Sequence, residues 1–461
     1  MGALGSVNLG DAMIDTGKRT EPGPLTRLIQ PHCSGTGIMV SPTSKMRWGT
    51  RWTAAAVAVR RVFALISGLP FEYHSTLVIS VSSFWSFEKE KAMKLRRFVL
   101  GLVFIVAGVV QADTIRVPRD YPRIQWAIDV CQDGDTVLVA DGVYKGDGNR
   151  DISFGGKKIT VRSKNGPQDC TIDCEGNEND PHRGFYFHNS ETQDAKLDGF
   201  TIKNGYATAE SPGGFFGGGV YIKKASPTLT HCTFDGNFAD QGGAVMWKSS
   251  YSTMANCTIV RNSANGGGSG LYCWLGSPRI SNCVIAENAG KGTIACYQSN
   301  ATITNCAVMG NHSLGEGAGA IHCHNSDTVI TNCTITGNSG EGNGGGISCR
   351  WRANPIITNC ILWDNTPPGI YLIYRCKPKV TYSDVQGGWR GKKNIDADPK
   401  WVSGPFGDFY LSQLRCGQDE DSPCLDAGKG KAKELGLKKF TTCTEGLKDK
   451  KKVDMGCHYP R

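Results

Sequence analysis

Ile330-Thr-Asn-Cys-Thr-Ile-Thr-Gly-Asn338 is the clearest copy of a nine-residue stretch that recurs along the middle of the chain. Five further copies are Leu229-Thr-His-Cys-Thr-Phe-Asp-Gly-Asn237, Met254-Ala-Asn-Cys-Thr-Ile-Val-Arg-Asn262, Ile280-Ser-Asn-Cys-Val-Ile-Ala-Glu-Asn288, Ile303-Thr-Asn-Cys-Ala-Val-Met-Gly-Asn311 and Ile357-Thr-Asn-Cys-Ile-Leu-Trp-Asp-Asn365. The cysteines of successive copies stand 23–27 residues apart. Self-similarity at a near-constant period is the signature of a repeat architecture.

The length of the period distinguishes among the known repeat architectures. Degenerate copies at 197–205 and 380–387 bring the total to eight. Helical repeats need about 33 residues or more and propeller blades about 40, and leucine-rich repeats need a leucine lattice that this chain lacks. Short Ile/Val/Thr-rich strands between Gly, Asn and Ser turns fit coils of three strands, which must stack to bury their apolar faces. We therefore predict an all-β fold, a right-handed parallel β-helix with three sheets and about eight or more coils.

Two asparagine series and two cysteine series repeat with the coils. The side-chain phase slips between Asn332 and Cys333, which predicts a bend with asparagine amides stacked from coil to coil. The series from Asn237 to Asn365 should mark the next bend. We expect both cysteine series, including Cys273, Cys296, Cys323 and Cys349, to point inward as reduced thiols. The irregular cysteines Cys416, Cys424, Cys443 and Cys457 are better disulfide candidates.

The repeat region has different sequence at its two ends. Residues 114–117 read as a short strand, and an amphipathic helix over 121–131 could cap the core with Ile124, Trp126, Ala127, Ile128 and Cys131. We assign 113–145 to this cap and the first coil, 146–390 to the β-helix, and 391–461 to an irregular C-terminal cap. Caps are expected because an open β-helix end exposes core and strand edges.

A targeting signal precedes the cap. Residues 93–112 combine Met93-Lys-Leu-Arg-Arg97, an apolar run and Val110-Gln-Ala112, the order of a signal peptide. The run is too short for a stable membrane span. We interpret 1–92 as a mis-called, disordered upstream extension and predict export in a bacterium to the cell surface or medium. Residues 1–112 hold 13 of the 51 Lys+Arg and 6 of the 42 Asp+Glu, so the remainder is only +2. Nucleic acid is therefore not an expected partner.

The chain resembles the secreted bacterial β-helix proteins of the pectin-lyase-like superfamily. The resemblance covers about 113–428, and the Asn-Cys-Thr-Ile repeats resemble the middle of these proteins. Their ends are resembled by Ile115-Arg-Val-Pro-Arg-Asp-Tyr-Pro-Arg-Ile-Gln-Trp-Ala-Ile-Asp129, Asp133-Gly-Asp-Thr-Val-Leu-Val-Ala-Asp-Gly-Val-Tyr144, Asn394-Ile-Asp-Ala-Asp-Pro399 and Ser422-Pro-Cys-Leu-Asp-Ala-Gly428. It implies polysaccharide as the substrate class. The catalytic motifs of its esterases and polygalacturonases are missing, so it supplies no activity.

Strand alternation predicts an aromatic stripe on one outer face. If Met246, Cys273 and Cys296 point inward, the residues that follow them point outward. The stripe is then Lys223, Trp247, Trp274, Tyr297, His324 and Arg350, with Tyr272 beside it. Flat rings suit the C–H faces of sugars, and cations suit uronate carboxylates. Stacking between coils would explain the same rings without a ligand.

We predict a monomeric protein that binds polysaccharide through this stripe. A polysaccharide lyase or hydrolase is one alternative, for which the sequence identifies no catalytic residue, and a structural or adhesive surface protein is another. His322 and His324 share the outer face, but two histidines are too few ligands for a metal. No metal site and no cofactor are therefore expected from the sequence.

Overall fold

The computed structural model describes residues 112–461, except residues 212, 316, 343 and 450. The proposed extension 1–92 and, apart from Ala112, the proposed signal peptide 93–112 lie outside the described residues. The described residues belong to one unit, 109–461. None of the described helices has the length and apolar character needed to cross a membrane.

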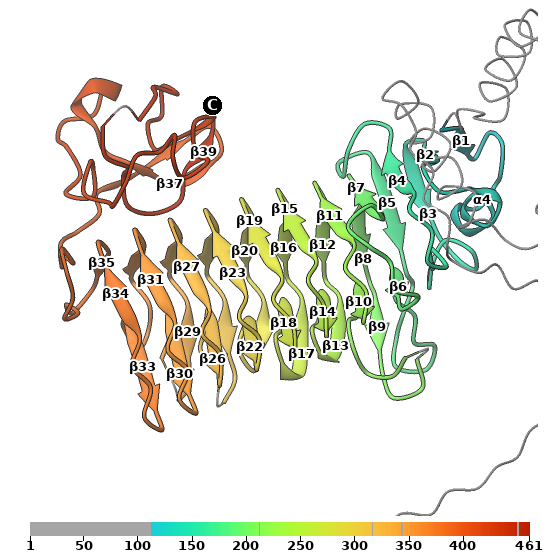
Figure 1. Cartoon of the computed structure of the whole chain (residues 1–461), viewed down its shortest axis with the longest axis horizontal. Helices are drawn as coiled ribbons and strands as arrows, with labels where there is room; N and C mark the ends of the chain where they lie inside the picture. The colour runs from blue at the N-terminus through green and yellow to red at the C-terminus, as the bar shows by residue number, and fades with distance from the viewer. Residues whose placement is uncertain (1–111, 212, 316, 343, 450) are drawn as a thin grey trace, which may run out of the picture. The chain divides into compact units, whose positions relative to one another are not determined.

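Successive coils add parallel strands to three long sheets (Figure 1). Within the described residues, sheet A has 11 strands: β1 (Thr114–Val117), β2 (Thr136–Val139), β4 (Thr160–Ser163), β7 (Lys196–Asp198), β11 (Thr228–Thr230), β15 (Thr253–Ala255), β19 (Arg279–Ser281), β23 (Thr302–Thr304), β27 (Val329–Thr331), β31 (Ile356–Thr358) and β34 (Lys379–Thr381). Sheet B has 10 in the same part of the chain: β3 (Gly142–Tyr144), β5 (Cys170–Asp173), β8 (Thr201–Lys203), β12 (Thr233–Asp235), β16 (Thr258–Val260), β20 (Val284–Ala286), β24 (Ala307–Met309), β28 (Thr334–Thr336), β32 (Ile361–Trp363) and β35 (Asp384–Val385).

Sheet C carries the predicted stripe. Its 8 described strands are β6 (Phe185–Phe187), β10 (Val220–Lys223), β14 (Val245–Lys248), β18 (Leu271–Trp274), β22 (Ile294–Tyr297), β26 (Ile321–His324), β30 (Ile347–Arg350) and β33 (Ile370–Ile373). Neighbouring strands come from successive coils, and β6 and β33 form the two edges.

A fourth parallel sheet was not expected. Sheet D lies between the B and C segments of six successive coils and consists of β9 (Tyr206–Ala207), β13 (Phe238–Gln241), β17 (Ser263–Gly267), β21 (Ala289–Gly290), β25 (His312–Ser313) and β29 (Ser339–Gly340) among the described residues. Five of these strands directly follow an asparagine of the second series, and β9 follows Gly205. All six lie in stretches that read as turns because they are short and rich in Gly, Ser and Asn. The predicted fold class is confirmed, with about ten turns and this additional sheet.

Both asparagine series stand at bends. The chain adopts a left-handed conformation at Asn332, with φ of 53°, between sheets A and B. The second series forms the longer amide ladder: the side-chain Nδ2 of Asn237, Asn262, Asn288, Asn311 and Asn338 each donates to the Oδ1 of the next member at 2.8–3.0 Å. This ladder satisfies buried backbone groups at every bend, which an apolar residue could not do.

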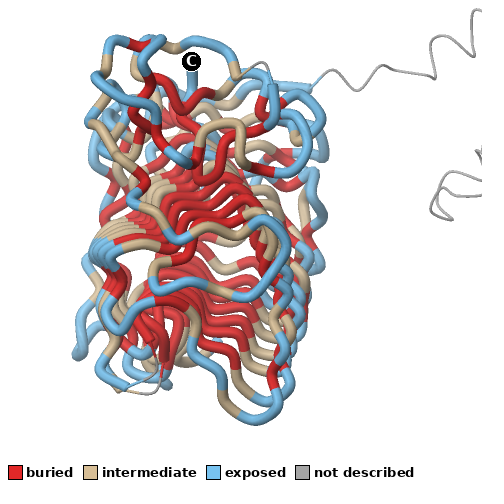
Figure 2. The backbone as a smooth tube through the Cα atoms, turned by 90° about the vertical axis from the view of Figure 1, so that its left-hand side faces the viewer, coloured by how far each residue is buried: buried red, intermediate tan, exposed pale blue. Residues whose placement is uncertain are grey.

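The core runs along the inside of the coils as columns of apolar side chains, and the coil backbone around it is buried (Figure 2). Both cysteine series lie in these columns as free, buried thiols, as predicted. Cys273, Cys296, Cys323 and Cys349 stand at matching positions on four neighbouring strands. Small side chains suit a narrow interior in which every position repeats.

The N-terminal helix is α4 (Ile124–Val130). Ile124, Ala127, Ile128 and Cys131 are buried against the core, as predicted. The prediction for Trp126 is wrong because its side chain is 46% exposed, and the Arg123 guanidinium lies 4.9 Å from its ring.

The C-terminal segment packs on the bends between sheets A and B. It contains β36 (Trp401–Gly404), β37 (Gly407–Leu411), the 3-10 helix η3 (Leu414–Cys416), β38 (Phe440–Thr441) and β39 (Tyr459–Pro460). Asn305 and His458 exchange two hydrogen bonds, and Ile361 of β32 packs with Leu411. Of the four irregular cysteines, Cys416 and Cys443 form a disulfide, whereas Cys424 and Cys457 are free and buried.

Candidate functional site

The outer face of sheet C presents one column of side chains next to the turn that ends each strand. The strand register gives this column, called the outer stripe below, as Lys223, Lys248, Trp274, Tyr297, His324, Arg350 and Ile373. Five of the predicted stripe residues are members: Lys223, Trp274, Tyr297, His324 and Arg350. They are exposed or half-buried.

The prediction for Trp247 is wrong. Trp247 pairs with Cys273 and points into the core, where it is fully buried, and Lys248 takes its place in the outer stripe. The prediction places Met246 at the inward position equivalent to Cys273, whereas Met246 pairs with Tyr272. Because successive residues of a strand face opposite sides, this one-residue offset reversed the orientation of both side chains.

Tyr272 lies in a second outward column, but it is buried with 6% of its surface exposed. Its ring stacks on Tyr297 of the next coil at 5.3 Å. The column also contains Tyr221, Met246, Ala295, His322 and Ser348, all buried. Burial raises the pKa of Tyr272 and of Tyr221 well above the ordinary tyrosine value. This column stabilises the sheet and offers little surface to a ligand.

Rings in the middle of the outer stripe stack along the solenoid. Tyr297 and His324 lie 4.6 Å apart with their planes 15° from parallel. Burial lowers the pKa of His324, and the charge of Arg350 acts in the same direction, so the imidazole is neutral at pH 7. Parallel stacking turns ring faces toward neighbouring coils and leaves edges at the surface. The middle of the stripe is therefore largely engaged in stacking, the alternative weighed from the sequence.

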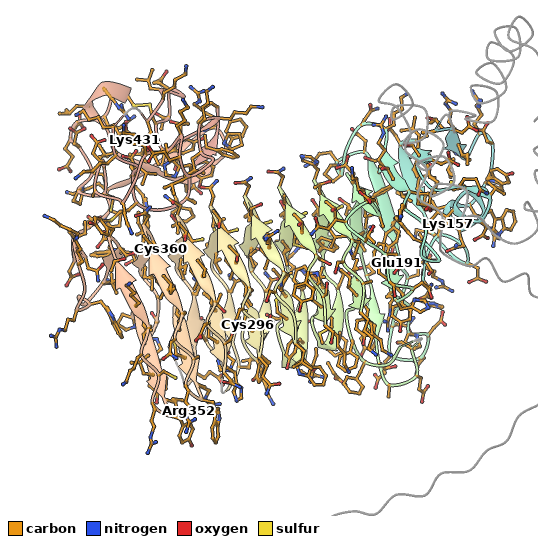
Figure 3. All side chains as sticks on the ribbon, viewed as in Figure 1. Lys157, Glu191, Cys296, Arg352, Cys360 and Lys431 are labelled. Carbon is orange, nitrogen blue, oxygen red and sulfur yellow. A yellow bond between two sulfur atoms is a disulfide. The ribbon has the colours of Figure 1, made fainter. Side chains whose placement is uncertain are left out.

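In the last two coils the aromatic side chains at this end of sheet C are exposed to solvent. Arg350, Trp351, Arg352, Tyr371, Tyr374 and Arg375 form what we call the aromatic–arginine patch. Trp351 and Tyr374 stack on each other at 4.6 Å, and they are 52% and 58% exposed. Arg352 lies at the end of its coil remote from Lys431 of the C-terminal segment (Figure 3). Among the described residues, the C-terminal segment makes no hydrogen bond, ion pair or ring contact with Trp351, Arg352, Tyr371, Tyr374 or Arg375 of this patch.

The backbone at the patch is strained. Trp351, Arg352, Tyr374 and Arg375 all have φ between 53° and 63°, the left-handed region. Earlier coils place single residues such as Leu275, Gln298 and Asn325 in this conformation at the same turn. A left-handed conformation costs a residue with a Cβ about 1–2 kcal/mol. Strain held by large exposed side chains is more typical of a functional surface than of a structural turn.

Sequence reasoning missed a charged cluster beside β6, at the opposite edge of sheet C. The His182 imidazole bonds both the Asp151 and Asp180 carboxylates through its two nitrogens, the latter at 3.0 Å. Arg183 is fully buried, its Nη2 donates to the Gly214 carbonyl at 2.7 Å, and its guanidinium lies 5.5 Å from the Tyr221 ring. Burial lowers the pKa of Arg183 to about 10. The residues are spread over separate coils without a repeat, so no sequence spacing indicates that they meet.

The family follows from the repeat region. The model of the right-handed beta helix region matches residues 149–328 and 269–391, which together span more than half of the chain. The chain belongs to the right-handed β-helix family. No curated protein matches the sequence.

Several solved structures are similar to this one at low sequence identity. Pectate lyase Pel9A is 15% identical over 73% of this chain and 90% of its own, with a TM-score of 0.43. An alginate lyase from Paenibacillus sp. str. FPU-7 is 12% identical over 59% of this chain and 99% of its own, with a TM-score of 0.33. A rhamnogalacturonan lyase is 13% identical over 64% and 88%, with a TM-score of 0.30. At these values the likeness concerns the fold alone.

Proposed function

We propose that this β-helix protein binds an acidic, uronate-containing polysaccharide on the outer face of sheet C, with its main contacts at the aromatic–arginine patch. The observation that carries the proposal is the exposed pair Trp351 and Tyr374 flanked by arginines. An exposed apolar patch rimmed by polar groups is typical of an interaction site.

The charges of the patch fit a carboxylate-bearing chain. Arg352 and Arg375 are exposed, and neither forms a salt bridge within the described residues. A guanidinium can hold a carboxylate with two parallel hydrogen bonds, which a lysine cannot. Lys248 and Lys223 continue the positive charge along the outer stripe toward β6. An extended polymer could reach the arginines of the patch at one end of the outer stripe and Lys248 and Lys223 at the other.

The experiment compares retention of the full chain on immobilised polyuronates and on uncharged glucans. We expect retention on polygalacturonate or alginate and release at about 0.5 M salt, where the Debye length falls to a few ångströms. Trp351→Ala combined with Tyr374→Ala should abolish retention, whereas Trp126→Ala, at an exposed tryptophan of helix α4, should leave it unchanged. Equal retention on neutral and acidic gels would contradict the proposal.

Cleavage of polysaccharide is the second candidate, favoured by one observation. His182 is held between two carboxylates, an arrangement suited to proton transfer. It lies beside β6, whereas the aromatic–arginine patch lies beside β33 at the other edge of sheet C. Unsaturated uronate or new reducing ends, appearing with time and absent in His182→Ala, would make the protein an enzyme.

Export belongs to the same proposal, because polysaccharide of this kind lies outside the cytoplasm. The proposed signal peptide 93–112 predicts a mature N-terminus at Asp113. N-terminal sequencing of protein recovered from the medium or cell surface tests this directly.

A further inference from the structure

Three side chains that could bind a cation meet inside the C-terminal segment. Ligand atoms of Asp449, Asp454 and His458 all lie within 4.8 Å of one another. The His458 side chain is completely buried, the Asp449 side chain is 2% exposed, and Asp454 is 1% exposed. A charged side chain is costly to bury in such a position unless an opposite charge or a metal ion compensates it.

The imidazole of His458 is arranged as a metal ligand. Its Nδ1 lies 3.1 Å from the Gly456 carbonyl oxygen and therefore carries the proton that it donates there. Its Nε2 is buried, has no hydrogen-bond partner in the described residues, and faces the Asp449 carboxylate with 3.7 Å between Nε2 and Oδ2. A histidine that ligates a metal commonly donates its other ring N–H to a backbone carbonyl in this way.

Both carboxylates accept hydrogen bonds that fix their orientation. Oδ1 of Asp454 accepts from the Asp426 backbone N–H at 2.7 Å, and its Oδ2 accepts from the Thr442 hydroxyl at 2.5 Å. Oδ2 of Asp449 accepts from the Asp454 backbone N–H at 3.1 Å. In the described part of the chain, no lysine or arginine forms a salt bridge with Asp449 or Asp454.

We propose that Asp449, Asp454 and His458 bind one Zn²⁺ ion, which fastens the C-terminal segment to the β-helix. One imidazole nitrogen and two carboxylate oxygens are ligands that zinc accepts, with a water molecule as the fourth. Calcium and magnesium prefer oxygen ligands alone, so the histidine selects against them. No sequence pattern indicates this site, because its residues follow no metal-binding spacing.

The position of the site explains what the ion would do. His458 exchanges two hydrogen bonds with Asn305 of the first asparagine series, at 2.7 and 2.9 Å. Asn332 of the same series donates to the Asp454 carbonyl at 3.3 Å. A zinc ion would therefore join the two residues that dock the segment on the bends between sheets A and B. Its role would be structural and independent of polysaccharide binding.

The test is the zinc content and thermal stability of the full chain. Protein purified, stripped with chelator and dialysed against excess ZnCl₂ should retain about one zinc per chain by mass spectrometry of the metal. Restoring zinc should raise the melting temperature by several degrees, whereas CaCl₂ and MgCl₂ should not. Retention below about one zinc in ten chains, or a melting temperature that zinc does not change, would overturn the proposal.

Variants separate zinc binding from misfolding. Asp449→Asn keeps an oxygen for the Asp454 N–H and removes a charge, so we expect loss of zinc with an unchanged far-ultraviolet circular dichroism spectrum. Asp419→Asn, at an exposed aspartate of the same segment, is the matched control and should keep its zinc. A folded Asp449→Asn protein that still binds one zinc would contradict the ligand assignment. Binding to polyuronate should be the same with and without zinc, so failure of either proposal leaves the other intact.

Discussion

The Lys248 ammonium lies 4.2 Å from the centre of the Trp274 ring, one coil further along sheet C, and 5.0 Å from the ring of Phe216. These distances place a cation between two aromatic rings on the outer face. The contact explains why a lysine at position 248 fits among the aromatic residues of the outer stripe. The ring faces stabilise its charge, and its alkyl chain packs beside them.

This contact should be measurable as a coupling between the two residues. Lys248→Met and Trp274→Ala should each lower the free energy of unfolding, and the double variant should lose about 0.5–1 kcal/mol less than the sum. Chemical denaturation of the four proteins measures the coupling. Lys223→Met paired with Trp274→Ala is the control cycle, since the described residues place no ring against Lys223. Additive losses at Lys248 and Trp274 would contradict the contact.

Trp247 and Trp351 should behave in opposite ways. Trp247→Ala removes a fully buried side chain and should cost about 3–5 kcal/mol of stability without changing polyuronate affinity in protein that remains folded. Trp351→Ala truncates a side chain that is 52% exposed and should reduce affinity with a stability change under about 1 kcal/mol. Denaturation curves and polyuronate-binding curves of both variants measure the two effects separately. A binding defect confined to Trp247→Ala would instead support the orientation predicted from the sequence, with Trp247 on the outer face.

These two tryptophans show what the sequence could and could not predict. The repeat around Cys333 has a strong period, so it predicted the fold, the inward cysteines and the asparagine bends correctly. Strand alternation gives a side chain's face only once the register is known, and the coil of Trp247 lacks the cysteine that fixes register elsewhere. Trp351 and Tyr374 follow their strands in turns, where no periodicity indicates exposure. The contact of His182 with Asp151 and that of His458 with Asn305 join segments that are distant in the chain, which one sequence does not reveal.

The amide ladder should be the most sensitive polar feature of the fold. Nδ2 of Asn288 donates to Asn311 at 2.9 Å and to the Ile259 carbonyl at 3.0 Å, and its Oδ1 accepts from Asn262. Asn288→Ala leaves these buried groups unsatisfied and should cost about 2–4 kcal/mol, since each buried unsatisfied group costs about 1–3. The exposed Asn165→Ala, which loses one surface bond to Asp141, should change stability by less than about 0.5 kcal/mol. Similar losses in both variants would show that the ladder contributes nothing beyond ordinary surface bonds.

Asp384 should make stability fall as pH rises. Burial raises the pKa of Asp384 from 3.8 to about 6 in the folded chain. The folded state therefore binds the proton more tightly than the unfolded state, and this contribution is fully present below pH 3.8 and lost as pH rises through about 6. Asp384→Asn should be about 1–3 kcal/mol more stable than the native chain at pH 7.5 and no more stable at pH 4. Denaturation at both values tests this, with the exposed Asp408→Asn as control. A gain that is equal at both pH values would refute the titration.

The most direct test of the central claim is calorimetric titration of the full chain with polygalacturonate oligomers, alongside Trp351→Ala and the double variant Arg352→Gln/Arg375→Gln. We predict binding that weakens with salt, at least about tenfold weaker binding for Trp351→Ala, and a shallower salt dependence for the arginine variant. Binding of equal strength and equal salt dependence in all three proteins would show that acidic polysaccharide binds elsewhere. No binding by the native chain would leave the aromatic–arginine patch without this function.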